Sequence, residues 1–159
     1  NTICACGQKN QSIVFDETAK QDIMYGLATL DIFSHQLFAE WYNSEFDNYN
    51  PKPHILDSLK SVSQDYKIQI ILGTWCKDSR REVPRFIKLL NEISYPIEQL
   101  EIIGVNRRKV CPEANINEGY VDFVPTFIVF KGQREVGRII EQPNISFEDD
   151  LLAILSTIN

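Results

Sequence analysis

The feature that most constrains the fold of this chain is an apolar run of strand length that leads directly into a Trp-Cys turn. Residues 68–74 are almost all apolar, which is typical of a strand covered on both faces. Trp75 and Cys76 follow, and a helical pattern occupies residues 79–93. A buried strand that turns directly into an amphipathic helix predicts the α/β class, because each element buries its apolar side against the other.

The same periodicity predicts further helices and strands along the chain. An aromatic-rich N-terminal stretch fits a helix whose rings we expect to pack in the core, and a capping box at Ser146 begins the last helix. From residue 54 onwards the order of elements predicts a mixed sheet with helices on both faces. The predicted helices are 17–46, 54–66, 79–93 and the segment after Ser146, and the predicted strands are 68–74, 100–105, 127–130 and 135–140.

Composition narrows the classes of function. The length of 159 residues suits one domain, and a net charge of −6 argues against nucleic acid as a partner. Two short basic runs, Arg80-Arg81 and 107–109, are expected to be solvated. Four cysteines are too few for a disulfide scaffold, and no spacing of Cys and His fits a zinc site. We therefore expect neither a metal nor a cofactor.

Four motifs follow one another along the chain: Trp75-Cys76-x-x-Ser79, Pro84, Val124-Pro125-Thr126 and Phe130-Lys131-Gly132. In this order and spacing they resemble the thioredoxin family over about residues 54–157. The resemblance implies a thioredoxin fold at 54–159, preceded by a tail or tether at 1–14 and a helical extension at 15–53. It also implies that Pro125 is cis and faces the sulfur of Cys76.

Two positions depart from the thioredoxin pattern. Ser79 stands where the second cysteine of the family motif would be, and Ile70 stands where thioredoxins bury an aspartate. The two losses agree, because without a resolving thiol there is nothing for a buried base to deprotonate. The chain therefore keeps the attacking thiol of the family and lacks the usual resolving one.

Cys76 is the predicted nucleophile, since a thiolate attacks disulfides and a helix N-terminus favours a thiolate. Lys77 should favour this charged form and Asp78 should oppose it. Ser79 can donate a hydrogen bond to the sulfur from the next turn. Trp75 would shape the environment of the sulfur. Pro125 would hold the backbone of a client, as the resemblance implies, and Val124 belongs to the environment of the motif.

Three functional interpretations of Cys76 remain open. Cys76 attacks a disulfide and Cys111 resolves the product, or Cys76 works as a monothiol that exchanges with an external thiol or retains its client. In the third, the fold is a non-catalytic binding module. The leading prediction is a monomeric thiol–disulfide oxidoreductase-like protein whose partners are protein or small-molecule thiols and disulfides.

The N-terminal residues resemble an export signal. Cys4-Ala5-Cys6-Gly7 has the small side chains of a cleavage site and is similar to a bacterial lipoprotein box, with Cys6 as the lipidated residue. This pattern predicts export to the bacterial periplasm, with a membrane tether through Cys6. The alternative is a cytoplasmic protein whose tail carries two incidental thiols.

Overall fold

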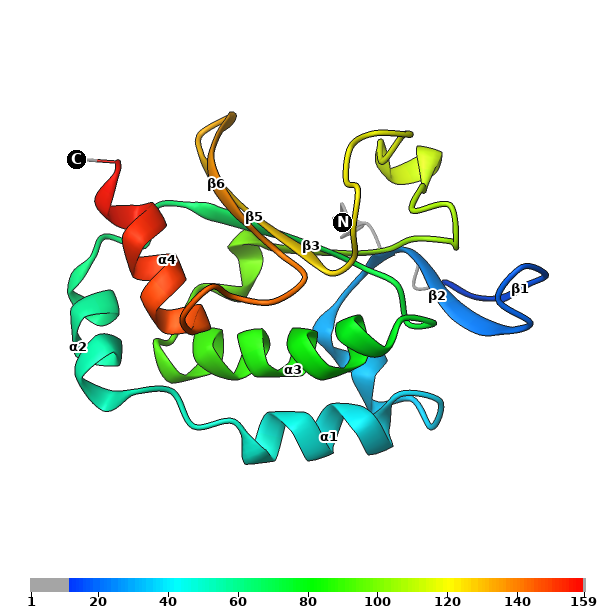
Figure 1. Cartoon of the computed structure of the whole chain (residues 1–159), viewed down its shortest axis with the longest axis horizontal. Coiled ribbons are helices and arrows are strands. Elements are labelled where there is room, and N and C mark those ends of the chain that lie inside the picture. Colours follow the sequence, from blue (N-terminus) through cyan, green and yellow to red (C-terminus); the bar gives the residue numbers. More distant parts are fainter. Residues whose placement is uncertain (1–11, 159) are drawn as a thin grey trace, which may run out of the picture.

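A six-stranded mixed sheet with the strand order β1-β2-β4-β3-β5-β6 organises the protein, which confirms the predicted α/β class (Figure 1). The computed structural model describes residues 12–158. β3 and β4 are parallel, and the other neighbouring strands are antiparallel. The strands are β1 (Ser12–Asp16), β2 (Gln21–Ala28), β3 (Lys67–Leu72), β4 (Leu100–Gly104), β5 (Thr126–Lys131) and β6 (Arg134–Ile140).

Four α-helices and three short 3-10 turns lie in the described part of the chain. α3 is the longest and passes through Pro84 without interruption. α4 begins at the predicted cap, where Ser146 Oγ accepts a hydrogen bond from the backbone N–H of Asp149 at 3.1 Å. The helices are α1 (Ala39–Asn48), α2 (Pro53–Ser61), α3 (Lys77–Glu92) and α4 (Phe147–Ser156), and the 3-10 turns are η1 (Leu30–Ser34), η2 (Ile97–Gln99) and η3 (Pro112–Ala114).

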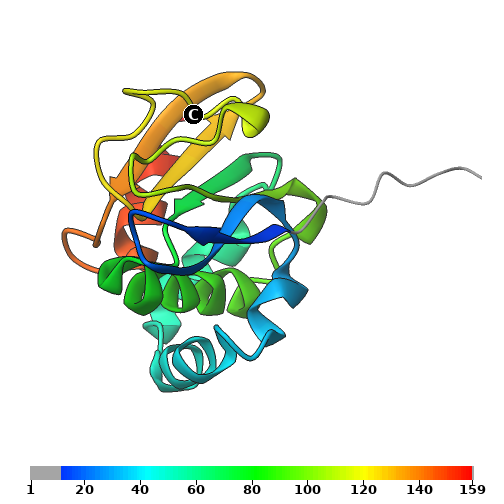
Figure 2. The ribbon, with the colours of Figure 1, turned by 90° about the vertical axis from the view of Figure 1, so that its right-hand side faces the viewer.

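The two faces of the sheet are covered differently, which corrects the prediction of helices on both faces. Alternate strand residues such as Ile70 and Leu72 join the core cluster that includes α3 and α4. Ile71 and Ile103 point to the other face, where they pack against the connection 105–124. Figures 1 and 2 place the α-helices on one side of the sheet and this connection, with its single-turn η3, on the other.

The helix predicted over residues 17–46 was wrong in its first half. Residues 12–28 form the β1–β2 hairpin instead, and the end of β2 pairs with β4 from Gly26–Gly104 to Ala28–Ile102. The sheet thus includes residues that the sequence assigned to a helical extension. The second half is helical as predicted, since α1 occupies Ala39–Asn48.

The aromatic residues between Phe33 and Tyr49 are buried in the core or packed against it, as expected. Phe33 is buried and stacks on Tyr42 of α1 with 4.5 Å between ring centroids. Phe38 is also buried, and Trp41 and Phe46 pack against the same cluster. Such ring pairs add stability beyond their burial, so α1 is fixed against η1 and α3.

Candidate functional site

Cys76 lies at the junction between β3 and α3 and is the N-cap residue of that helix. Its backbone N–H donates to the carbonyl of Gly73 at 2.9 Å, and its own carbonyl accepts the N–H of Arg80 at 3.1 Å. The side chain is half-exposed. The predicted strand–turn–helix junction therefore presents the sulfur at the surface, next to the unpaired N–H groups of the first helical turn.

The sulfur of Cys76 contacts the Val124–Pro125 segment. Its Sγ–H donates to the carbonyl oxygen of Val124 at 3.5 Å. The Val124–Pro125 peptide bond is cis, as the resemblance implies. The Oγ1 of Thr126 donates to the carbonyl of Phe123 at 2.7 Å and closes this turn. Cys76 and Val124 thus lie in contact, although almost fifty positions separate them in the sequence.

A set of hydrogen bonds fixes the turn that precedes Cys76. Thr74 Oγ1 accepts the backbone N–H of Met24 in β2 at 3.0 Å. Arg80 Nε donates to the carbonyl of Thr74 at 2.6 Å, and its terminal NH2 donates to Gln21 Oε1 at 3.0 Å. β2 therefore supports the turn directly. Sequence reasoning missed this role and wrongly expected Arg80 to be solvated, although its place one turn after Cys76 was a usable signal.

Trp75 is held against the end of β4. Its Nε1–H donates to the carbonyl of Val105 at 2.9 Å. A Cβ atom on Gly73 would lie 2.4 Å from the indole ring, so only glycine leaves room for Trp75 in this position. The guanidinium carbon of Arg107 lies 4.8 Å from the ring centroid on the solvent side, as in a cation–π contact.

Ser79 is fully buried and does not contact the sulfur in the way the sequence suggested. Its Oγ accepts the backbone N–H of Gly73 at 3.1 Å, so it ties the first turn of α3 to the end of β3. The sulfur of Cys76 is paired with Val124 instead. Of the neighbouring charges, Lys77 is exposed and Asp78 forms an ion pair with Arg81 at 2.9 Å.

Cys111, the predicted resolving residue, is free but fully buried. It exchanges backbone hydrogen bonds with Ile116, and its sulfur lies 3.6 Å from Glu113 Oε2. Tyr25 OH donates to that same oxygen at 2.9 Å. Burial raises the pKa of the Cys111 thiol, which disfavours the reactive thiolate. Cys111 and Cys76 contact the same apolar cluster, but no disulfide joins them.

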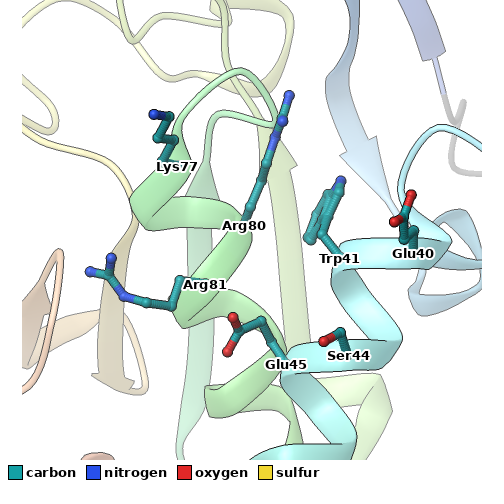
Figure 3. A pocket seen from close by; sticks show the side chains of 7 residues that line it. All are labelled: Glu40, Trp41, Ser44, Glu45, Lys77, Arg80 and Arg81. Atoms are coloured by element: carbon teal, nitrogen blue, oxygen red, sulfur yellow. The ribbon is translucent and has the colours of Figure 1, made fainter.

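A groove of about 460 Å³ lies between α1 and the first turns of α3 (Figure 3). Lys77 and Arg80 line it from α3 and Trp41 lines it from α1. Lys77 follows Cys76 directly in the sequence, but Cys76 itself does not line the groove. The remaining lining residues are Glu40, Ser44, Glu45 and Arg81.

Residues 12–158 contain no group of three or more His, Cys, Asp and Glu side chains placed to hold a metal ion. Over the same residues no helix is both long enough and apolar enough to cross a bilayer. The predicted lipidation site Cys6, together with Cys4, lies outside the described residues.

Several solved structures resemble this one in fold, whereas the sequence matches no described protein family and no curated protein. A protein of unknown function from Pseudomonas aeruginosa, PA1234, has a TM-score of 0.53 and 13% identity over 76% of this chain and 82% of its own. An HIV epitope-scaffold has a TM-score of 0.52 and 14% identity over 75% and 82%. At this identity the likeness concerns the fold alone.

Proposed function

We propose that the chain has a thioredoxin fold and that Cys76 is the nucleophile of thiol–disulfide exchange. The observation that carries this proposal is the contact between the half-exposed sulfur of Cys76 and the carbonyl of Val124, at the N-terminus of α3. A thiol in such a place is accessible to a substrate and lies next to the free N–H groups of a helix N-terminus. The parallel β3–β4 pair and the antiparallel β5–β6 pair also fit that fold.

The exchange needs only groups that the chain and its substrates supply. Cys76 loses its proton to water, and its thiolate attacks one sulfur of a disulfide. The sulfur–sulfur bond of the substrate breaks, and the other half leaves as a thiolate that takes up a proton. A second thiolate, from outside the chain, then attacks the mixed disulfide and releases Cys76. The net reaction replaces one thiol of the disulfide by another, so no separate oxidant is required.

Monothiol exchange is favoured over a two-thiol mechanism because neither Ser79 nor Cys111 is placed to resolve a mixed disulfide on Cys76. Ser79 cannot release a mixed disulfide, and its hydroxyl is buried against Gly73. Cys111 is buried beside Glu113 and has a raised pKa, so it would have to become exposed before it could resolve the adduct on Cys76. The competing proposal is a binding module that uses the same surface without a chemical reaction. Phe123, an exposed aromatic side chain next to Val124, favours this alternative.

Disulfide mapping tests the proposal. The reduced protein is treated with 2-hydroxyethyl disulfide, quenched by alkylation and digested, and the state of each cysteine is read by mass spectrometry. We expect a mixed disulfide on Cys76 that disappears on addition of an external thiol, because a second thiolate can attack it. Cys111→Ala should leave this adduct in place, and Cys76→Ser should abolish it.

Each other result has a defined meaning. A bond between Cys76 and Cys111 would replace the monothiol mechanism by a two-thiol one. A Cys76 that stays unmodified while the protein is folded would contradict both and leave the binding module. Because the mapping resolves individual peptides, adducts on Cys4 or Cys6 cannot be mistaken for adducts on Cys76.

A further inference from the structure

Three cations lie around the Trp75-Cys76 turn without an ion pair to any carboxylate of residues 12–158. Lys77 is exposed and follows the nucleophile directly. Arg80 donates its hydrogen bonds to two neutral acceptors, a backbone carbonyl and a glutamine oxygen. Arg107 lies over the ring of Trp75, 4.8 Å from its centroid. Their positive charges are therefore not cancelled locally.

Most carboxylates of the neighbouring helices are already paired. Arg81 forms ion pairs with Asp78 at 2.9 Å and with Glu82 at 2.5 Å. Arg85 pairs with Glu45 at 2.8 Å. Glu40, on the α1 side of the groove, has no ion pair in the described chain. Lys77, Arg80 and Arg107 therefore remain without a carboxylate partner in the described residues, although the whole chain has a net charge of −6.

The groove supplies room for a charged substituent. Lys77 and Arg80 stand at one end of it, which is the end where α3 begins (Figure 3). Glu45 lies further along the groove, next to Ser44. Lys77, which follows Cys76 directly, is the lining residue nearest to it in the sequence. On the other side of the turn, Arg107 would meet a substrate of Cys76 over Trp75.

We propose that the preferred substrate of Cys76 is a thiol or disulfide with a carboxylate close to its reacting sulfur. This inference rests on the proposed exchange at Cys76 and names its substrate class. Opposite charges a few ångströms apart attract one another even at the surface, and a local positive field raises the encounter rate of an anion. Without these cations, an acidic protein would repel such a substrate.

A series of small disulfides that differ in charge tests the inference. The probes are 3,3′-dithiodipropionate with two carboxylates, neutral 2-hydroxyethyl disulfide and cationic cystamine. Each rate of adduct formation on Cys76 is divided by the rate with 2-mercaptoethanol, which removes intrinsic differences between the probes. We expect the dianion to have the highest relative rate and cystamine the lowest. The difference between these two relative rates should decrease as the salt concentration rises from about 0.05 M to 1 M, because the ions screen the charges.

Single variants separate the cations from the thiol. Lys77→Gln and Arg107→Gln should each lower the ratio of the dianion rate to the neutral-probe rate by about two- to fivefold, because this ratio cancels any change in the reactivity of the thiol itself. Arg107→Lys keeps the positive charge, so it should retain most of the preference for the dianion that Arg107→Gln removes. Lys60→Gln is the matched control, since Lys60 is an exposed lysine in α2, at the other end of the sheet from the start of α3 (Figure 1).

The outcomes keep the two proposals apart. Adducts on Cys76 with all three probes, at relative rates that neither variant changes, would overturn the substrate class and leave the exchange reaction intact. No adduct with any probe would overturn the exchange reaction itself, and the substrate class with it.

Discussion

At the scale of single residues, Ser79 is a structural residue. Its Oγ accepts the N–H of Gly73 inside the protein. Neither group is accessible to water, so the bond satisfies a donor that would otherwise be buried and unpaired. Ser79 therefore contributes a hydrogen bond that fixes the turn before Cys76.

Replacement of Ser79 by alanine should lower stability without removing reactivity. Ser79→Ala leaves the Gly73 N–H without a partner, which should reduce the free energy of unfolding by about 1–3 kcal/mol. Urea denaturation measures this change. The rate of adduct formation on Cys76 in the folded protein should change less than about threefold, because Ser79 does not contact the sulfur and threefold corresponds to less than 1 kcal/mol.

The control for this variant is Ser61→Ala. Ser61 is exposed in α2, where its hydroxyl donates to the carbonyl of Ser58, so its loss should change stability by no more than about 0.5 kcal/mol. A tenfold or greater loss of Cys76 reactivity in folded Ser79→Ala would mean that the hydroxyl acts on the sulfur after all.

At the scale of elements, β2 is where sequence reasoning failed. Ile23, Leu27 and Leu30 recur at helical spacing, which led to the prediction of a helix. The partner that makes the segment a strand is β4, more than seventy residues further along. A local sequence pattern carries no information about such a distant strand pairing. By contrast, β3, α3, β5 and α4 were all predicted, because the apolar pattern within each segment specifies its own structure.

Gly104 is the residue that permits the β2–β4 contact. A Cβ atom there would lie 2.4 Å from the backbone oxygen of Met24, and a backbone atom cannot rotate away. Gly104→Ala should therefore force β2 away from β4 and cost about 1–3 kcal/mol, the usual range for an overpacked core. Chemical denaturation gives the value.

Gly137→Ala in β6 is the matched comparison. Its Cβ would meet only side-chain atoms of Ile154, at 2.8 Å, and a side chain can change its rotamer. We expect Gly137→Ala to be the milder of the two variants. Equal losses would show that the close approach of β2 to β4 is not what requires glycine at position 104.

At the scale of the whole molecule, the candidate site combines local and distant parts, and the sequence predicted the local part better. Trp75, Cys76 and the cis Pro125 belong to short motifs and were named in advance. The hydrogen bonds from Met24 and Arg80 to Thr74 depend on how β2 meets the start of α3. No short motif marks these contacts, since they arise only when the sheet is assembled.

The covering helices are also joined over long sequence distances. Tyr49 OH, after α1, donates to Glu148 Oε2 at 2.5 Å, and the backbone N–H of Lys52 donates to Oε1 of the same carboxylate at 2.9 Å. Lys52 Nζ forms an ion pair with Asp149 at 2.5 Å. Two adjacent acidic residues at the start of α4 thus fasten the α1–α2 connection to the C-terminal helix.

This link predicts how stability depends on pH. The hydrogen bond from Lys52 holds the pKa of Asp149 below its usual value, with a smaller effect from Ser146. The folded state therefore binds this proton less readily than the unfolded chain does. The stabilisation is fully present above the unfolded pKa of about 3.9 and is lost as the pH falls through the lower folded pKa.

Lys52→Gln should reduce the acid sensitivity that Asp149 contributes. Without the ammonium group, the folded pKa of Asp149 moves towards its unfolded value, so less stability depends on its ionisation. Urea denaturation at neutral pH and at about pH 3 measures the free energy of unfolding at each pH. The difference between the two values should be smaller for this variant than for the natural chain.

Asp57→Asn is the control, because Asp57 is exposed in α2 and has no ion pair in residues 12–158. If Lys52→Gln retained the full pH dependence, the acid sensitivity would have to come from other carboxylates, such as Asp65, whose pKa is lowered by Lys131.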